Sequence, residues 1–454
     1  MKHTDTIAAF CTAPGGALAI IRISGPEALR LAETVWYSSR KLSAEHPRVL
    51  TFGRVRLEDG EGLGETCLAV YMPGPASYTG EDIVEIQCHG GACAPRRILS
   101  RLLANGARLA EPGEFTKRAF LNGKMDLTEA EAVADLIGAK SEAAFRLAER
   151  QLSGALGRKV RSAKEEMFLI LAEIESRLDF PEEDLDWQTP ARIVERINKV
   201  KSSLEQLLAG RDRSAVIRNG VRLAIAGSPN VGKSSLLNLL LGYERAIVTD
   251  IPGTTRDTLS EQAVLRGISV DLTDTAGIRD QVADAVEGFG VERSRDTLKL
   301  SEVVFWVFDA SRDPQDDLEA MKKEVPAGTK AIAIWNKCDL APEGFTPPDT
   351  GCPAVCVSVK EETGMEALLN AFETAVWGSG DKSIPECAVS ERHAGALERA
   401  VSLLEMAIPE TEAEMYELTA ENLRAARQEL AEITGESTAP DVLDDIFSRF
   451  CIGK

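Results

Sequence analysis

The sequence has no long hydrophobic run: nowhere do about 18 consecutive apolar residues occur, which is the length that a membrane-spanning helix needs. Its first residues also lack the apolar core of a signal peptide. Nine cysteines are present without a C-x-x-C pair, which is more typical of reduced thiols than of a disulfide framework. These absences predict a cytoplasmic protein that does not associate with membranes.

Positive charge is scarce as well, because 52 lysines and arginines face 72 aspartates and glutamates and leave a formal charge of -20. Broad non-specific nucleic-acid binding needs clustered cations at the phosphates, so this class is disfavoured, although a local basic patch is still compatible with the charge. Cys88, His89 and Cys93 lie close together in the sequence, but their spacing suits no common zinc site and favours burial. With 454 residues and no internal repeat, the length suggests about three domains.

Residues 227–234 are GSPNVGKS and match the phosphate-binding template G-x-x-x-x-G-K-[ST]. An apolar run at 221–226 precedes them and a helical pattern follows, which is the strand, loop and helix context that the template requires. The glycines let backbone amides close on phosphate oxygens, Lys233 supplies a cation, and Ser234 is placed to ligate magnesium. A chance match in a loop is the alternative.

Three further motifs follow, each after its own predicted strand. The sequence DTAG at 274–277 places a carboxylate near the magnesium and a glycine amide near the terminal phosphate. NKCD at 336–339 provides a carboxylate for the two adjacent N–H donors that guanine has and adenine lacks, and SVK at 358–360 provides a last base-contacting loop. Four motifs in this order predict a guanine-nucleotide-binding domain.

The segment between the phosphate loop and DTAG contains TDIPGTTRD at 249–257. Thr255 is the candidate for a magnesium ligand that senses the γ-phosphate, and neighbouring carbonyls with the Asn230 side chain are placed to surround a monovalent cation. Ile278 occupies the position of the water-orienting glutamine of Ras-like proteins, so hydrolysis is either very slow or assisted by another group. The polar segment that follows offers three carboxylates, which taken singly are more often solvated charges: Asp280, Asp284 and Glu287.

The flanks of this domain differ from each other. Residues 1–120 show a mixed α and β pattern, in which Arg22 and Glu85 stand out as charges within apolar strands. A solvated face is the commoner explanation for such charges, and a ligand site is the alternative. Helical patterns cover 121–215 and 381–454, on either side of the α/β domain at 216–380. In the first block one face is formed by Leu127, Ala130, Val133, Ala134 and Ile137, and in the second by Leu423, Ala426, Leu430 and Ile433. We expect one helical bundle into which that domain is inserted, with two independent bundles as the weaker alternative.

Several stretches outside the nucleotide motifs are more specific. They are DTIAA at 5–9, LAIIRISG at 18–25, YTGED at 78–82, PGEFTKRAFLNGK at 112–124, GTTRD at 253–257, EITGE at 432–436 and FCIGK at 450–454. On these stretches the chain resembles the MnmE (TrmE) family of tRNA modification GTPases, of the TrmE-Era-EngA-like class, over essentially its whole length. The resemblance implies three parts: an α+β N-terminal domain similar to folate-binding domains, an all-α helical bundle, and an inserted α/β Ras-like P-loop G domain.

The resemblance also implies a function. Such proteins are homodimers, joined through the N-terminal domain, that bind GTP and GDP. They act with a flavoprotein partner, MnmG, in a heterotetramer or larger assembly, on the wobble uridine (position 34) of certain tRNAs. They add a carboxymethylaminomethyl or aminomethyl-type group whose one-carbon unit comes from a folate, and their GTP hydrolysis is activated by potassium. In this chain Glu287 would be the general base or water-orienting residue, and Cys451 matches a cysteine for which a catalytic role is suggested; simple packing of Cys451 is the equal alternative.

The residues implied for each ligand are as follows. GTP would contact Asn230, Val231, Gly232, Lys233, Ser234, Ser235, Thr249, Asp250, Ile251, Pro252, Gly253, Thr254, Thr255, Asp274, Thr275, Ala276, Gly277, Asn336, Lys337, Asp339, Ser358, Val359 and Lys360. Magnesium would be held by Ser234 and Thr255, and potassium by Asn230, Thr249, Ile251 and Thr254. A tetrahydrofolate such as 5-formyltetrahydrofolate would be bound by Arg22, Glu85, Lys124 and Lys454.

Two departures from the family pattern are small: the loop at 12–16 is shorter, and the segment between Gly277 and Glu287 is one residue longer than in some relatives.

Two other functions compete with this one. A ribosome-assembly GTPase acting as a switch on RNA particles would need an RNA-binding module or a second G domain, and the sequence shows neither. A self-assembling membrane GTPase would need a basic amphipathic helix or a lipid anchor, which are also lacking.

Overall fold

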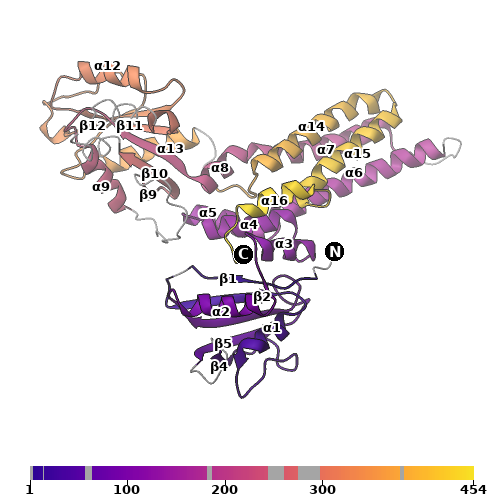
Figure 1. Ribbon diagram of the computed structural model, residues 1–454. Coiled ribbons are helices and arrows are strands. Elements are labelled where there is room, and N and C mark those ends of the chain that lie inside the picture. Colours follow the sequence, from indigo (N-terminus) through magenta and orange to yellow (C-terminus); the bar gives the residue numbers. More distant parts are fainter. Residues whose placement is uncertain are drawn as a thin grey trace. The chain divides into compact units, whose positions relative to one another are not determined.

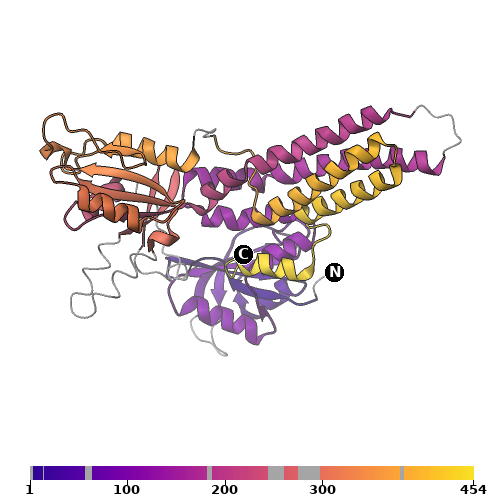
Figure 2. The same ribbon diagram turned by 90° about the horizontal axis from the view of Figure 1, so that it is seen from above.

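The computed structural model describes residues 4–13, 15–56, 64–180, 187–243, 260–274, 297–378 and 383–454. Its chain divides into two compact units (Figures 1 and 2). The first unit comprises Met1–Ala134, Gln151–Gln206 and Arg392–Lys454, and the second comprises Asp135–Arg150 and Leu207–Glu391. Within the described residues, no helix has the length and hydropathy needed to cross a membrane.

A seven-stranded sheet occupies the N-terminal part of the first unit, in the order β3-β4-β5-β6-β2-β1-β7. Neighbouring strands are antiparallel except for β1 and β7, which are parallel. The strands are β1 (Ile7–Phe10), β2 (Leu18–Ser24), β3 (Trp36–Tyr37), β4 (Thr51–Val55), β5 (Glu65–Met72), β6 (Ile83–His89) and β7 (Arg108–Leu109).

Alternation along β2 decides which face of this sheet is covered. Ala19, Ile21 and Ile23 point into a core that also contains apolar residues of α1 (Ala28–Val35) and α2 (Ala94–Ala104), so both helices cover that face. Arg22 points to the opposite face, because side chains alternate along a strand. There Phe115, from α3 (Glu114–Leu121), packs with Ile7, Ala9 and Tyr78.

The rest of the first unit is helical. α6 (Ala155–Asp179), α7 (Pro190–Ala209), α14 (Glu391–Glu412) and α15 (Tyr416–Thr434) lie side by side in both views, and α16 (Pro440–Ser448) packs on α3 (Figures 1 and 2). The apolar stripe predicted for α15 is fully buried: Leu423, Ala426, Leu430 and Ile433. The stripe predicted for α4 (Leu127–Gly138) extends too far, because Ile137 is 39% exposed and lies beyond the cluster that Leu127 and Ala130 form with Phe447 and Phe450.

The second unit is built on a six-stranded sheet in the order β13-β12-β11-β8-β10-β9, parallel except for the antiparallel edge strand β9. Its strands are β8 (Val221–Ala226), β9 (Ser260–Leu265), β10 (Ile268–Asp274), β11 (Val303–Asp309), β12 (Lys330–Asn336) and β13 (Ala354–Cys356). The helices are α5 (Glu142–Leu152), α8 (Arg211–Asn219), α9 (Lys233–Tyr243), α12 (Gln315–Glu324) and α13 (Met365–Trp377), with a short turn at Cys338–Leu340. Ligands of such sheets bind at the carboxyl ends of the parallel strands, and every described nucleotide motif follows one of these ends.

Candidate functional site

The phosphate loop leaves the carboxyl end of β8 and enters α9 at Lys233. Gly227 and Gly232 have φ values of 137° and 102°, which favour glycine. A Cβ at Gly227 would lie 2.3 Å from the carbonyl oxygen of Val307, and a Cβ at Gly232 would lie 2.3 Å from Asn336 Nδ2. The two glycines therefore allow the loop to pass closely over β11 and the NKCD motif.

Lys233 closes the phosphate loop from inside. Its Nζ donates hydrogen bonds to the carbonyl oxygens of Gly227 at 2.9 Å and Ser228 at 2.7 Å, and the residue is only 7% exposed. Ser234 and Ser235 are exposed at the first turn of α9. A cation within the loop and hydroxyls at a helix N-terminus are the groups that a phosphate chain with its magnesium requires.

Asn336 connects this loop to the base-contacting loops. Its Nδ2 donates to the carbonyl oxygen of Val231 at 2.8 Å, and its Oδ1 accepts from the Val359 amide at 3.1 Å. The side chain is 3% exposed, so the hydrogen bond to Val231 is shielded from water and the one from Val359 is shielded in part. One buried amide therefore holds the GSPNVGKS, NKCD and SVK motifs together.

Lys337 makes a second connection. Its Nζ donates to the carbonyl oxygen of Asn230 at 2.9 Å and to Asp309 Oδ2 at 2.6 Å. Burial raises the pKa of Asp309, but hydrogen bonds from Lys337 and Ser311 outweigh it and hold the pKa below its ordinary value. The ionised Asp309 thus fixes the lysine against the phosphate loop.

Asp339 is the exposed carboxylate of NKCD, and Ser358 Oγ donates to its Oδ1 at 2.6 Å. This contact orients the carboxylate while one oxygen keeps its capacity to accept the paired N–H donors of a guanine. The neighbouring Lys360 forms an ion pair with Glu361 at 3.5 Å. The geometry provides a base-recognition carboxylate at the edge of the sheet.

Two contributors to this site were missed at the level of sequence. Asp309 ends the apolar run of β11, and a carboxylate in that position is the signal that would have found it. Asp317, in the first turn of α12, accepts a hydrogen bond from Ser228 Oγ in the phosphate loop. No sequence signal distinguishes Asp317 from the other acids of α12.

The magnesium and potassium shells are described only in part. Asp274 ends β10 opposite Ile225 of β8, so its backbone lies beside the strand that leads into the phosphate loop. The remaining residues singled out in the sequence lie outside the described part of the chain: Thr249, Asp250, Ile251, Pro252, Gly253, Thr254, Thr255, Thr275, Ala276, Gly277, Ile278, Asp280, Asp284 and Glu287. Among the described residues no group of three or more His, Cys, Asp or Glu side chains is arranged to hold a metal.

Arg22 and Glu85 face each other across β2 and β6. Arg22 Nε donates to Glu85 Oε1 at 2.8 Å, and the side chains are 15% and 16% exposed, so a solvated face is the wrong explanation for these charges. The guanidinium lies 5.2 Å from the Tyr78 ring centre and 5.5 Å from that of Phe115. A largely buried ion pair flanked by two aromatic rings is suited to a flat heterocycle with both donors and acceptors.

The two lysines predicted with this pair come from different segments. Lys124 is exposed and donates to the carbonyl oxygen of Pro75 at 3.0 Å. Lys454 accepts a main-chain hydrogen bond from Phe115 at 3.2 Å, and its charge acts on the Cys11 thiol together with those of Arg22 and Glu85. The pKa of Cys11 is raised, chiefly by burial.

The last residues of the chain dock on the sheet of the N-terminal part. Ile452 forms a β-bridge with Pro112, and Cys11 Sγ donates to the carbonyl oxygen of Gly453 at 3.2 Å. Gly453 has a φ of 99°, and a Cβ there would lie 1.7 Å from the carbonyl oxygen of Phe10. Cys451 is exposed, so packing does not account for it.

The other cysteine and histidine cluster considered in the sequence does not form a site. Cys88 is buried as predicted, whereas Cys93 is exposed. His89 Nδ1 lies 2.6 Å from Glu65 Oε1. These contacts place the three residues in separate environments.

Two family models match the chain. One is described as the MnmE helical domain and matches residues 127–451, and the other as the GTP-binding protein TrmE N-terminus and matches residues 6–124. The tRNA modification GTPase MnmE of Chloroflexus aurantiacus is 44% identical over 458 residues, which cover 99% of this chain and 100% of that protein. The protein of the same name from Geobacter sulfurreducens is 44% identical over 461 residues, covering 100% of both.

Solved structures resemble the chain more weakly. The G domain of the T. maritima FeoB iron transporter is 26% identical with a TM-score of 0.25, over 34% of this chain and 98% of that one. A GTP-binding protein from Sulfolobus solfataricus in complex with GDP is 16% identical with a TM-score of 0.24, over 47% of this chain and 66% of that one. TM-scores this low say nothing of the fold as a whole.

Proposed function

Because the chain belongs to the MnmE family of tRNA modification GTPases, we propose that it couples a potassium-activated cycle of GTP hydrolysis to modification of the wobble uridine of certain tRNAs. The observation that carries the GTPase part is the buried Asn336 amide, which joins the phosphate loop to both base loops. Three motifs joined in this way are placed to bind one guanine nucleotide rather than separate ligands. The name of the family adds tRNA as the molecule that is modified.

In this mechanism the chain's own residues perform recognition and positioning. Asp339, held by Ser358, accepts the N–H donors of guanine. A bound base without these donors would cover the carboxylate and exclude water from it without replacing the lost hydrogen bonds. Loop amides and Lys233 would bind the phosphates, and Ser234 with Thr255 would hold magnesium, which would supply positive charge at the phosphate oxygens. Asn230, Thr249, Ile251 and Thr254 would surround potassium, which supplies the positive charge that an arginine finger supplies elsewhere.

Glu287 is proposed to orient the attacking water, in place of the glutamine that Ile278 replaces. Glu287→Ala is expected to abolish hydrolysis while the affinity for GTP stays nearly unchanged, since the carboxylate acts on water and not on the nucleotide. Hydrolysis and nucleotide binding are measured in parallel with potassium and with sodium. Glu386→Ala is the control, because Glu386 is an exposed carboxylate of the same unit outside the nucleotide motifs. An equal loss of binding and hydrolysis would exclude this role.

The N-terminal part is proposed to bind the folate that donates the one-carbon unit. The Arg22–Glu85 pair provides a donor and an acceptor between two rings, and Lys124 and Lys454 provide cations for an anionic tail. Cys451 is exposed near the end of the docked tail and is proposed to take part in the modification chemistry. We further propose a homodimer that acts with the flavoprotein MnmG, and domain limits at residues 120, 215 and 380.

Mass spectrometry of tRNA nucleosides tests the proposed function. Cells that lack the protein are expected to lose the modified wobble uridine, and the wild-type gene is expected to restore it while a Glu287→Ala variant does not. Persistence of the nucleoside without the protein would overturn the proposal. GTP-dependent co-sedimentation with ribosomal subunits would then favour the ribosome-assembly alternative.

A further inference from the structure

The acidic charge of the chain is distributed unevenly. Residues 1–124 contain 15 lysines and arginines and 13 aspartates and glutamates, a formal charge of +2. The remaining residues therefore carry a formal charge of -22, which together with +2 gives the total of -20. A polyanion is repelled by most of this chain and least by its N-terminal part.

Within that part, α2 is basic along its whole length. It contains Arg96, Arg97 and Arg101 and no acidic residue. Its apolar side, with Ile98, Leu99 and Leu102, packs into the core over the sheet, which turns Arg96 and Arg97 outward, and both are exposed. The positive end of the helix dipole adds to the charge of these two arginines, because both lie in its first turn.

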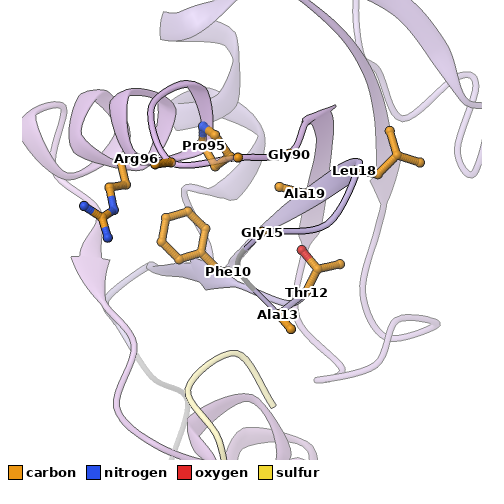
Figure 3. A pocket seen from close by; sticks show the side chains of 11 residues that line it. Phe10, Thr12, Ala13, Gly15, Leu18, Ala19, Gly90, Pro95 and Arg96 are labelled. Atoms are coloured by element: carbon orange, nitrogen blue, oxygen red, sulfur yellow. The ribbon is translucent and has the colours of Figure 1, made fainter. Parts of the chain in front are cut away.

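A pocket opens beside this first turn (Figure 3). It has a volume of about 150 Å³ and is lined by Phe10 and Leu18 of the sheet, by Gly90 and Gly91, and by Pro95 and Arg96 of the helix. Figure 3 shows the Phe10 ring and the Arg96 side chain on the same side of the sheet. Leu18 is 63% exposed at the pocket, so an apolar ligand surface is accessible from solvent.

This pocket is distinct from the proposed folate site. Phe10 pairs with Ile21 and packs against the core under α1 and α2. Arg22, the next residue after Ile21, points to the opposite face with Tyr78 and Phe115. Phe10 and Arg22 therefore lie on different faces of one sheet, and Leu18 lines the pocket from the first residue of β2.

We propose that the exposed side of α2 and this pocket form the docking surface for tRNA. This inference rests on the proposed function. Arg96 and Arg97 contact phosphates, since arginine forms strong charge-assisted hydrogen bonds with them. The pocket takes one unstacked base against Phe10 and Leu18, because proteins recognise single-stranded RNA through bases splayed onto aromatic and apolar side chains. Charge selects the place of docking, and the pocket selects a strand with an unstacked nucleotide over a duplex.

Titration of a fluorescently labelled tRNA transcript with uridine at the wobble position tests the surface by anisotropy, using the full chain. For a single strand, log K falls with log[salt] with a slope of about -0.7 for each phosphate contact. Relative to 1 M salt, two contacts therefore contribute a factor of about 25 to the affinity at 0.1 M salt, and this factor is lost when they are removed. Arg96→Ala with Arg97→Ala is therefore expected to weaken binding about 25-fold and to flatten the salt dependence. Arg192→Ala with Arg449→Ala is the matched control, since these side chains are 60% and 74% exposed on other helices.

Leu18→Ala tests the pocket separately. It is expected to weaken tRNA binding without changing the salt dependence, because it removes apolar contact and no charge. Its effect should disappear with a fully double-stranded RNA of the same length. GTP hydrolysis, which takes place in the other unit, should be unchanged in all variants, and unchanged far-UV circular dichroism and urea unfolding show that the variants are folded.

Binding of the α2 double variant with wild-type affinity, or an equal loss in the control pair, would overturn the docking surface. A loss in the α2 variant with no effect of Leu18→Ala would overturn the base pocket. The proposed function has a separate readout in the nucleoside analysis. If cells need the protein for modification but the α2 double variant modifies tRNA like wild type, only the docking surface is wrong.

Discussion

Replacing Asn336 by alanine tests whether one side chain joins the phosphate loop to the base loops. The substitution removes the donor to the Val231 carbonyl and the acceptor of the Val359 amide. Both groups lie beneath a side chain that is 3% exposed, where water does not readily replace the lost partners. The variant therefore leaves a buried backbone acceptor, at Val231, and a partly buried backbone donor, at Val359, without these partners.

An unsatisfied buried polar group costs about 1–3 kcal/mol, so the two together cost about 2–6 kcal/mol. We expect the free energy of unfolding of the second unit to fall by this amount. Nucleotide affinity should fall as well, because the phosphate loop and the base loops are no longer held in one arrangement before the ligand binds. At about 1.4 kcal/mol for each factor of ten, even 2 kcal/mol on binding corresponds to a loss of roughly 30-fold.

Unfolding in urea, followed by tryptophan fluorescence, measures the first effect, and titration with a fluorescent GDP analogue measures the second. Trp306 and Trp335 lie buried in the strands next to the site and report on this unit. Asn370→Ala is the control, since that exposed amide accepts a hydrogen bond from Arg266 at the surface. A loss of stability below about 0.5 kcal/mol, the size of an ordinary surface effect, would refute the coupling.

Three further outcomes are expected. Gly453→Ala should release the docked C-terminal residues to proteolysis, because its Cβ would meet the carbonyl oxygen of Phe10 at 1.7 Å; Gly328→Ala, with a similar φ of 89° and no neighbour within 4 Å, should not. Burial raises the pKa of Glu131, but the charges and hydrogen bonds of His393 and Arg392 outweigh it and hold the pKa at about 2, below the ordinary 4.5. Glu131 therefore stabilises the protein above pH 4.5, and this stabilisation is lost as the pH falls towards 2. Glu131→Gln should weaken the dependence on pH of the free energy of unfolding, measured in urea, across that interval, and an unchanged pH dependence would contradict this. Arg22→Ala should abolish binding of 5-formyltetrahydrofolate in calorimetry and spare GTP hydrolysis; retained binding would remove Arg22 from the site.

The sequence alone was sufficient where function depends on a short contiguous segment. GSPNVGKS specifies the loop between its strand and its helix, because the glycines set the backbone and Lys233 is the first residue of the helix. Fully buried stripes such as that of α15 were also predictable, since the helical period places their apolar residues on one side. Ile137 was mispredicted because periodicity does not say where the covering cluster ends.

Tertiary structure decided what distant residues do to one another. Asn336 and Val231 are 105 residues apart, and only the parallel order of the strands brings the amide to the phosphate loop. Arg22 and Glu85 looked like solvated charges until the register of β2 and β6 paired them. Docking of the chain end on Phe10 likewise depends on a close backbone approach that only glycine permits.

The physical reason for this division is the range of the interactions. Backbone dihedrals and the periodicity of apolar residues act over a few positions, so the sequence by itself determined the motifs, their order and the nucleotide that they recognise. Hydrogen bonds, ion pairs and excluded volume act through space without regard to chain separation. Only the fold therefore decided that Asp309 holds Lys337, that the Arg22–Glu85 pair is shielded, and that an exposed arginine face lies beside a pocket.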